Sequence, residues 1–371
     1  MTTLSGILTD RLVRQLVHDG AVQSDEPIEA RQYQPASLDA RLGNIAYRIR
    51  SSFVPGNRPV ETVLDELLMY PIDLEQNGIL EKNQVYLVPL MESLRLPPQV
   101  AVRANPKSTT GRLDMLTRVI TDANYRFDDV RPGYHGKLYL EIVPKSFTVR
   151  VMPGLSLNQL RFLQGDCMLN DDALRALYHA APLLYDAEQQ PISMERASIQ
   201  DGLLMSVDLC GEQNQGIIGY KAKKNSHIVD LSKIRYYDAA DFWEPIYRQK
   251  RDDLILEPEE FHLLCSQEKI RIPPEYSAEM MAYDIGAGEF RVHYAGFFDP
   301  GFGYGSGDIP GTYAVLEVRS HEVPYRVSHG QPFCKLQYAR NVAPPETLYG
   351  EGIQSNYQQQ RLALSKQFKQ G

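Results

Sequence analysis

The chain repeats part of its own sequence at a constant offset of 176 positions. Residues 94–98 (LRLPP) recur as residues 270–274 (IRIPP), and further matches keep this offset over residues 79–160. Solenoid repeats have periods of about 20 to 50 residues, so a period this long is that of a whole domain. The sequence therefore predicts a tandem duplication, in which differences between the copies indicate where chemistry has been kept or lost.

Composition restricts the class of protein. The 371 residues include 39 basic and 47 acidic side chains, a net charge of −8 without a long run of either sign. A nucleic-acid groove would bring a basic stripe, so no nucleic-acid partner is expected. No stretch approaches about eighteen consecutive apolar residues, which predicts a soluble protein without a membrane partner. Four scattered cysteines without a Cys-x-x-Cys pair favour a reducing cytoplasm over disulfides or structural zinc; they are Cys167, Cys210, Cys265 and Cys334.

Hydrophobic spacing predicts a mostly β chain with a few short helices. Residues 138–142 and 147–151 alternate apolar and polar side chains, and a turn at 153–154 leads into a third strand. The second copy repeats this meander over residues 313–330. Many short strands separated by Gly and Pro turns favour distorted barrel or jelly-roll domains over alternating strands and helices.

Local signals predict two helices and the domain bounds. Thr9 is expected to cap a helix that ends at Gly20, and Asn170 to cap a second helix that leads into the linker. The residues after 345 are polar and glutamine-rich, which indicates a mobile arm rather than core. The predicted division is a first domain at 1–190, a second domain at 191–345 and a C-terminal arm at 346–371.

Four segments together resemble the dCTP deaminase and dUTPase superfamily, on the deaminase side. Residues 35–43 (PASLDARLG) resemble the family's first motif, and residues 107–113 (KSTTGRL) resemble its phosphate loop. Residues 139–141 (YLE) resemble the hairpin strand with the catalytic glutamate, and residues 349–366 resemble the arm that folds over the nucleotide. Residues 295–302 (AGFFDPGF) add a hairpin entry close to the family pattern. The resemblance implies two tandem dUTPase-like domains in a long, duplicated form of the bacterial deaminase.

The sequence departs from the family pattern at three places. Lys107 stands where the phosphate loop usually has arginine, and Thr109 where it has a second serine. In the arm, Asn356 stands where the family usually has lysine. Residues 122–125 (DANY) replace the expected Asp-Pro-Gly-aromatic string and precede an insertion before Gly136. These departures bear on phosphate and sugar contacts rather than on the fold.

Deamination at cytosine C4 needs a water molecule activated for attack and a proton delivered to the ring N3. Zinc deaminases use a His-x-Glu and Pro-Cys-x-x-Cys metal site, which this sequence lacks, so the expected reaction is metal-free at the base. The resemblance implies that Glu141 is the general base, with Arg112 and Ser108 nearby. Alternation alone would make Glu141 a solvent-facing strand residue. Its counterpart in the second copy, Glu317, is the alternative base.

The residues of the predicted phosphate loop have a composition suited to anions. Three hydroxyls precede a glycine, and two cations flank them, although an ordinary polar turn is the alternative reading. In the second copy Asp284 stands in the place of Ser108, and Gly288 in the place of Arg112. A carboxylate there would repel a triphosphate, so one nucleotide site per chain is expected. The predicted loop residues are Lys107, Ser108, Thr109, Thr110 and Arg112.

Further binding residues are expected around these two motifs. By resemblance Asp122 and Asp299 face the deoxyribose 3′-hydroxyl, with turn capping as the alternative. Asp39 and Asp208 occupy Ser-x-Asp strands that we match to each other, and a structural hydrogen bond is favoured for both. The arm residues expected near the nucleotide are Tyr357, Gln360, Arg361 and Lys366.

The combined prediction is hydrolysis of dCTP to dUTP and ammonia in the cytoplasm, which supplies dUTP for thymidylate synthesis. Mg²⁺ is expected on the triphosphate, held by phosphate oxygens and water, with no zinc. The resemblance implies a homo-oligomer, such as a trimer with sites between neighbouring domains. One alternative is a dUTPase or a bifunctional enzyme that releases dUMP, which residues 295–302 favour, whereas Glu141 disfavours it because a plain dUTPase does not need this residue. Another is a nucleotide-sensing protein whose catalytic sites have decayed.

Overall fold

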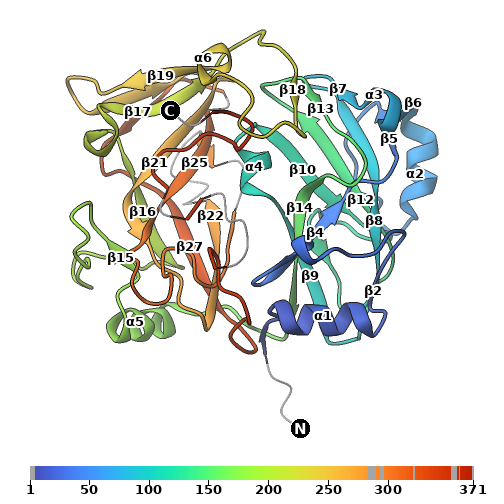
Figure 1. Ribbon diagram of the computed structural model, residues 1–371, viewed down its shortest axis with the longest axis horizontal. Helices are drawn as coiled ribbons and strands as arrows, with labels where there is room; N and C mark the ends of the chain where they lie inside the picture. Colours follow the sequence, from blue (N-terminus) through green and yellow to red (C-terminus); the bar gives the residue numbers. More distant parts are fainter. Residues whose placement is uncertain are drawn as a thin grey trace. The chain divides into compact units, whose positions relative to one another are not determined.

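The computed structural model describes residues 5–282, 290–292, 296–320, 322–351, 357–358 and 360–369 (Figure 1). Its contacts divide the chain into two compact units. The first unit contains Met1–Asp166, Lys224–Tyr237 and Ser365–Lys369; the second contains Cys167–Lys223, Asp238–Leu364 and Gln370–Gly371. The domain bounds predicted from the sequence stay a prediction, because these units are defined by packing rather than by the repeat.

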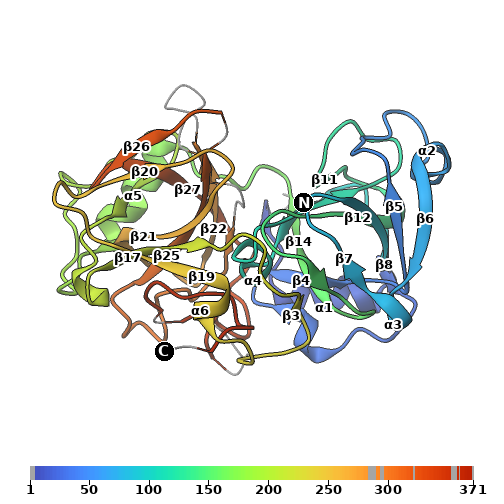
Figure 2. The ribbon, with the colours of Figure 1, turned by 90° about the horizontal axis from the view of Figure 1, so that it is seen from above.

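The first unit consists of curved, mainly antiparallel sheets with short helices. Its strands are β1 (Gly6–Ile7), β2 (Val22–Ser24), β3 (Tyr33–Gln34), β4 (Ser37–Arg41), β5 (Ile45–Ile49), β6 (Leu68–Asp73), β7 (Ile79–Leu80), β8 (Val85–Arg95), β9 (Val100–Pro106), β10 (Met115–Ile120), β11 (Asp129–Val130), β12 (His135–Pro144), β13 (Val149–Arg150), β14 (Ser156–Gln164) and β18 (Val229–Asp230). Its helices are α1 (Asp10–His18), η1 (Ala30–Gln32), α2 (Val60–Leu67), α3 (Leu74–Asn77) and α4 (Ser108–Gly111). One sheet has the order β11-β9-β14-β4-β3, and a second has the order β10-β12-β8-β5-β6. Figure 2 shows β5, β6 and β8 side by side in the second sheet.

The second unit has the same kinds of elements. Its strands are β15 (Leu184–Tyr185), β16 (Leu203–Asp208), β17 (Ile217–Ala222), β19 (Trp243–Tyr247), β20 (Asp253–Leu256), β21 (Phe261–Ile270), β22 (Tyr276–Ala282), β23 (Phe290–Val292), β24 (Phe297–Phe298), β25 (Thr312–Ser320), β26 (Tyr325–Ser328) and β27 (Pro332–Arg340). Its helices are α5 (Asp171–Ala180), η2 (Glu212–Asn214) and α6 (Ala239–Phe242). The strands β19, β17, β21, β16, β27, β22 and β24 follow one another in a single curled sheet, with β25 paired to β21.

Strand register confirms the tandem duplication. In the first unit β8 pairs with β5 and β12, and in the second unit β21 pairs with β17 and β25. Glu141 lies opposite Leu87, and Glu317 lies opposite Leu263, so both partners are displaced by the offset of the repeat. The mostly β fold with few helices is therefore confirmed, and each copy of the sequence forms the same sheet arrangement.

Both predicted helix starts are confirmed. Helix α1 begins after Thr9, although the Thr9 hydroxyl makes no capping hydrogen bond, and it ends at His18, with Gly20 at a φ of +74°. The Asn170 side chain accepts a hydrogen bond from the Ala173 N–H at 2.9 Å and caps α5. None of the helices that the structure describes is long and apolar enough to cross a membrane.

Strand pairing corrects the match between Asp39 and Asp208. Asp39 lies opposite Gln159, and the residue opposite the counterpart of Gln159, Lys335, is Leu204. The Ser-x-Asp similarity therefore misaligned the two strands by four residues. A leucine stands in the second unit where the first unit has Asp39.

The segment after residue 345 also differs from the expectation of an arm outside the core. Among its described residues, Leu364 and Phe368 are buried, and the Phe368 ring lies 6.3 Å from the ring of Tyr237 in the first unit. These two apolar side chains follow the glutamine run, and their burial shows that this part of the segment is packed rather than free in solvent. The polarity of the preceding residues concealed this in the sequence.

A buried ion pair ties the first motif to the sheet. The Arg41 Nε donates to Glu92 Oε1 at 2.9 Å, and the backbone N–H of Arg41 donates to Glu92 Oε2 at 2.7 Å. The Gln32 amide adds a third hydrogen bond to Oε1 at 3.0 Å. Both charged side chains are almost inaccessible to water. A carboxylate with this many donors is well satisfied, whereas loss of one partner would leave a bare buried charge.

Replacement of Arg41 by alanine should lower the free energy of unfolding of the first unit by about 3–5 kcal/mol, because Glu92 would lose its counter-charge. Hydrogen exchange of the β4 and β8 amides measures this locally. Arg126→Ala is the matched control, since its ion pair with Asp129 is exposed, and it should have a much smaller effect. Equal losses in the two variants would contradict the structural role of the buried pair.

Candidate functional site

The predicted phosphate loop forms the single turn α4 at the end of β9. Lys107 precedes the turn, and Arg112 follows it with only 3% of its surface exposed. Thr110 Oγ1 donates to the Leu157 carbonyl at 2.8 Å, which holds the turn against β14. Ser108 is exposed, and Thr109 is buried. Of the three predicted hydroxyls, that of Ser108 faces solvent and that of Thr110 anchors the loop.

A buried aspartate anchors the lysine of the loop. The Lys107 ammonium forms an ion pair with Asp39, which is 5% exposed and lies in β4. Burial raises the pKa of the Asp39 carboxyl, although the positive charge of Lys107 opposes this shift. The first motif and the phosphate loop, 68 residues apart in sequence, therefore meet through one charge pair.

The C-terminal segment contacts the same loop. Ser365 Oγ donates to the Thr109 carbonyl at 2.8 Å, and the Gln367 amide donates to the Leu231 carbonyl at 3.1 Å. Burial lowers the pKa of the Lys366 ammonium, and repulsion by Lys107 lowers it further. Within the first unit, the structure thus brings Lys366 to the predicted phosphate-binding residues.

Glu141 lies in the interior of the sheet rather than on its solvent face. Its side chain is fully buried in β12, opposite Arg118 of β10. Arg118 Nε donates to Glu141 Oε1 at 2.9 Å, and the guanidinium also stacks on the Phe127 ring at 3.9 Å. Glu141 Oε2 has no hydrogen-bond partner among the residues that the structure describes. Three residues separate α4 from β10, whose first residue, Met115, lies roughly 10 Å along the strand from Arg118.

Arg118 is the site residue that the sequence did not reveal. No motif marks it, and the strands β10 and β12 are separated by the insertion before Gly136, so their register cannot be counted across a short turn. Only strand pairing places its guanidinium against Glu141.

The two aspartates expected near the sugar lie in different surroundings. Asp122 Oδ1 accepts a hydrogen bond at 2.6 Å from the N–H of Val60, the first residue of α2. This contact is to the N-terminus of a helix 62 residues away rather than within the turn of Asp122, so the expected sugar contact stays a prediction. Asp299 follows β24 in the second unit and is buried.

The remaining predicted residues lie in the second unit. Glu317 is buried in β25 at the position that corresponds to Glu141. In the segment predicted to be the C-terminal arm, Tyr357 is buried and Arg361 is exposed. The Gln360 amide donates to the Tyr313 carbonyl at 3.1 Å. Asp284 and Gly288 lie outside the described residues, so the loss of a second phosphate loop stays a prediction.

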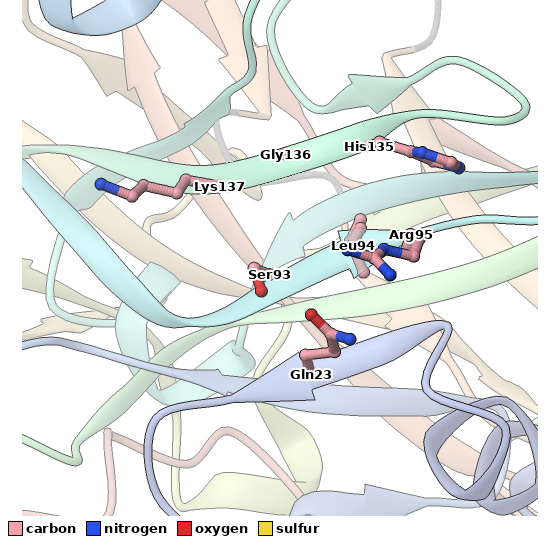
Figure 3. Close-up of a pocket in the computed structure, with 7 residues that line it drawn as sticks. All are labelled: Gln23, Ser93, Leu94, Arg95, His135, Gly136 and Lys137. Atoms are coloured by element: carbon pink, nitrogen blue, oxygen red, sulfur yellow. The ribbon is translucent and has the colours of Figure 1, made fainter.

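The first unit also contains a cavity that is not lined by the predicted motifs. It has a volume of about 590 Å³ and opens between β2, β8 and β12. Figure 3 shows its lining residues, which include Gln23, Arg95, His135 and Lys137. None of the site residues predicted from the sequence lines it.

One group of side chains in the described residues could approach a metal ion. Ligand atoms of Asp208, Cys210 and His329 lie within 4.8 Å of one another in the second unit. The His329 Nδ1 already accepts a hydrogen bond from the Leu209 N–H at 3.1 Å. The group contains no residue of the predicted catalytic set.

The charge cluster of the loop gives a direct test. Lys107→Met should raise the pKa of Asp39, which loses its counter-ion, and should also raise the pKa of Lys366, which loses a repelling neighbour. Nuclear magnetic resonance titration of labelled Asp and Lys side chains measures both values. Lys107→Arg, which keeps the charge, is the control. Unchanged pKa values in Lys107→Met would show that the three groups do not interact.

Comparison with family models matches both parts of the chain. Residues 4–166 match the model described as the 2′-deoxycytidine 5′-triphosphate deaminase (DCD) N-terminal domain, and residues 170–368 match that of the C-terminal domain. A curated relative from Dictyoglomus thermophilum, "dCTP deaminase, dUMP-forming", is 25% identical over 217 residues, which cover 56% of this chain and 100% of the relative. A relative of the same name from Beutenbergia cavernae is 27% identical over 159 residues, or 43% of this chain and 79% of the relative.

A solved structure is similar over nearly the whole chain. The crystal structure of 2′-deoxycytidine 5′-triphosphate deaminase from Agrobacterium tumefaciens is 45% identical, with a TM-score of 0.88. The match covers 95% of this chain and 100% of that chain. With both family models matched in order along the sequence, the chain belongs to the 2′-deoxycytidine 5′-triphosphate deaminase family.

Proposed function

We propose that the chain catalyses hydrolytic deamination of dCTP to dUTP and ammonia, with Glu141 as the general base. The observation that carries this proposal is the geometry of the Glu141 carboxylate. Oε1 is paired with Arg118, while Oε2 is buried and has no protein partner in the described part of the chain. A buried oxygen without a hydrogen bond is costly, so its retention indicates an acceptor for a donor that arrives with the substrate. The attacking water is such a donor.

In the proposed reaction the water oxygen bonds to C4 of the cytosine ring. Glu141 Oε2 accepts one proton of the water and passes it to N3, and the second proton goes to the amino group, which leaves as ammonia. Arg118 holds the carboxylate in place and balances its charge. Arg112 and Ser108 are proposed to act beside the ring, as the family resemblance implies.

The triphosphate is proposed to bind at α4. Lys107 and Lys366 supply positive charge and Ser108 an exposed hydroxyl, while Thr109 and Thr110 shape the loop. The Asp39 carboxylate is paired with Lys107. Mg²⁺ is therefore proposed to bind through phosphate oxygens and water rather than through this carboxylate. Further proposed contacts, to the sugar and from the C-terminal segment, come from Asp122, Asp299, Tyr357, Gln360 and Arg361.

A second candidate is deamination followed by release of pyrophosphate to give dUMP. The curated relatives reported above carry the name "dCTP deaminase, dUMP-forming", and residues 295–302 resemble the hairpin entry of such enzymes. The overall structural match instead carries the name of the deaminase alone. For either activity we propose a cytoplasmic homo-oligomer.

Glu141→Gln should keep dCTP binding and reduce deamination by about 10²–10⁴-fold, because the amide preserves shape but cannot accept the water proton. Ammonia release and nucleotide affinity are measured on the same preparation. Glu317→Gln is the matched control in the second unit and should retain near-normal turnover. If Glu317→Gln is the inactive variant, the base belongs to the second copy.

The product of dCTP turnover separates the two candidates. Incubation with dCTP and Mg²⁺ should release ammonia and dUTP without pyrophosphate, because the proposed chemistry takes place at the base alone. Chromatography resolves dUTP from dUMP, and a coupled assay detects pyrophosphate. Equal amounts of ammonia and pyrophosphate would instead establish the dUMP-forming reaction.

A further inference from the structure

A buried glutamate occurs at the same position in both units, but its surroundings differ between them. In the first unit the Arg41 guanidinium fills the space beside Glu92, with Nη2 bound to Ser24 Oγ at 2.7 Å and to the Glu26 carbonyl at 2.8 Å. The Pro27 carbonyl accepts from Nη1 at 3.1 Å. Together with Glu92, these oxygens accept hydrogen bonds from four of the five N–H donors of the guanidinium group.

The second unit keeps the glutamate and lacks the arginine. Glu268 is displaced from Glu92 by the offset of the repeat, and Ser206 occupies the strand position of Arg41. The backbone contact is also kept, since the Ser206 N–H donates to Glu268 Oε2 at 2.9 Å as the Arg41 N–H does to Glu92. Serine is too short to place a cation where the guanidinium lies in the first unit.

A cavity of about 460 Å³ occurs at this place in the second unit. Ser206 and Glu268 line it together with two further acids, Asp186 and Glu188. The register of β2 on β8 and of β15 on β21, continued by one residue, puts Asp186 at the position of Ser24. The hydroxyl that accepts from the guanidinium in the first unit is thus replaced by a carboxylate in the second.

We propose that this cavity binds a small guanidinium cation, with Glu268 and Asp186 as its acceptors. The cavity retains the acid of the first unit's guanidinium receptor and adds negative charge at its edge. Two parallel N–H donors of a guanidinium match one carboxylate, a geometry that a spherical cation cannot provide. Burial raises the pKa of the Glu268 carboxyl, while hydrogen bonds from the Ser206 hydroxyl and N–H oppose that shift.

Among the residues that the structure describes, the cationic side chains Arg196 and Lys269 lie near the cavity. Arg196 lines it, but its side chain is exposed. Lys269 donates to the Ala187 carbonyl at 3.1 Å, and burial lowers its pKa while Asp186 opposes that shift. Arg196 is therefore the competing internal occupant, and its variant forms part of the test.

Calorimetry of the full chain with methylguanidinium chloride tests the proposal at fixed ionic strength. One molecule should bind per chain, whereas neutral N-methylurea and donor-free tetramethylammonium should not bind. Glu268→Gln should weaken the affinity by on the order of tenfold or more. Ser206→Arg should abolish binding, because it supplies the guanidinium covalently, and its crystal structure should show that group on Glu268.

The converse variant is Arg41→Ser, which should create a second site in the first unit and raise the stoichiometry to two. Where that variant does not fold, Ser206→Arg decides the question. The proposal is overturned if the native chain shows no saturable methylguanidinium binding, or if Ser206→Arg binds as well as the native chain. Binding that occurs only in Arg196→Gln would also overturn it, since the native occupant would then be Arg196.

Discussion

The antiparallel register between the longest strands of each unit fixes the positions of the proposed base, Glu141, and of its counterpart, Glu317. In the first unit Leu87 opposes Glu141, and β10 adds Arg118 on the other side of the same strand. A slip of one residue would turn each side chain to the opposite face of the sheet. It would separate the guanidinium from the carboxylate and turn Leu140 and Ile142 to the face that Glu141 now occupies. The buried residues on both sides of Glu141, Leu140 and Ile142, hold this register.

Duplication has kept the backbone and changed the charges on it. The pairing of β4 with β14 recurs in β16 with β27, including its irregularity near the strand end. On this common frame Asp39 is replaced by Leu204, and Arg41 by Ser206. The first unit therefore holds the ion pairs that tie its loop and its first motif, while in the second unit Glu268 accepts hydrogen bonds from Ser206 in place of an ion pair with arginine. Sheet pairing depends on backbone hydrogen bonds, so it tolerates these exchanges.

Local sequence patterns were enough to predict the fold. The surroundings of several site residues depend instead on pairing and packing between segments that are distant in the sequence. Alternation and turn residues are local, so the strands of the meander and the Asn170 cap could be predicted. The role of Arg118 could not, because the insertion before β12 hides the register. The match of Asp208 to Asp39 was wrong because it relied on a short Ser-x-Asp motif. Strand pairing places the true counterpart four residues earlier, at Leu204. Phe368 is buried against residues that are distant in the sequence, including Tyr237. The polar residues next to Phe368 in the sequence gave no sign of that contact.

The composition of the first unit has a consequence for its biosynthesis. Most of the unit is made by residue 166, yet it also contains Ser365–Lys369, which are translated only after the strands of the second unit. Domains usually fold in order as they leave the ribosome. Here the nascent first unit must wait, with the place of Phe368 unfilled, until the strands of the second unit have been synthesised. The first unit is thus completed only after most of the second has been made.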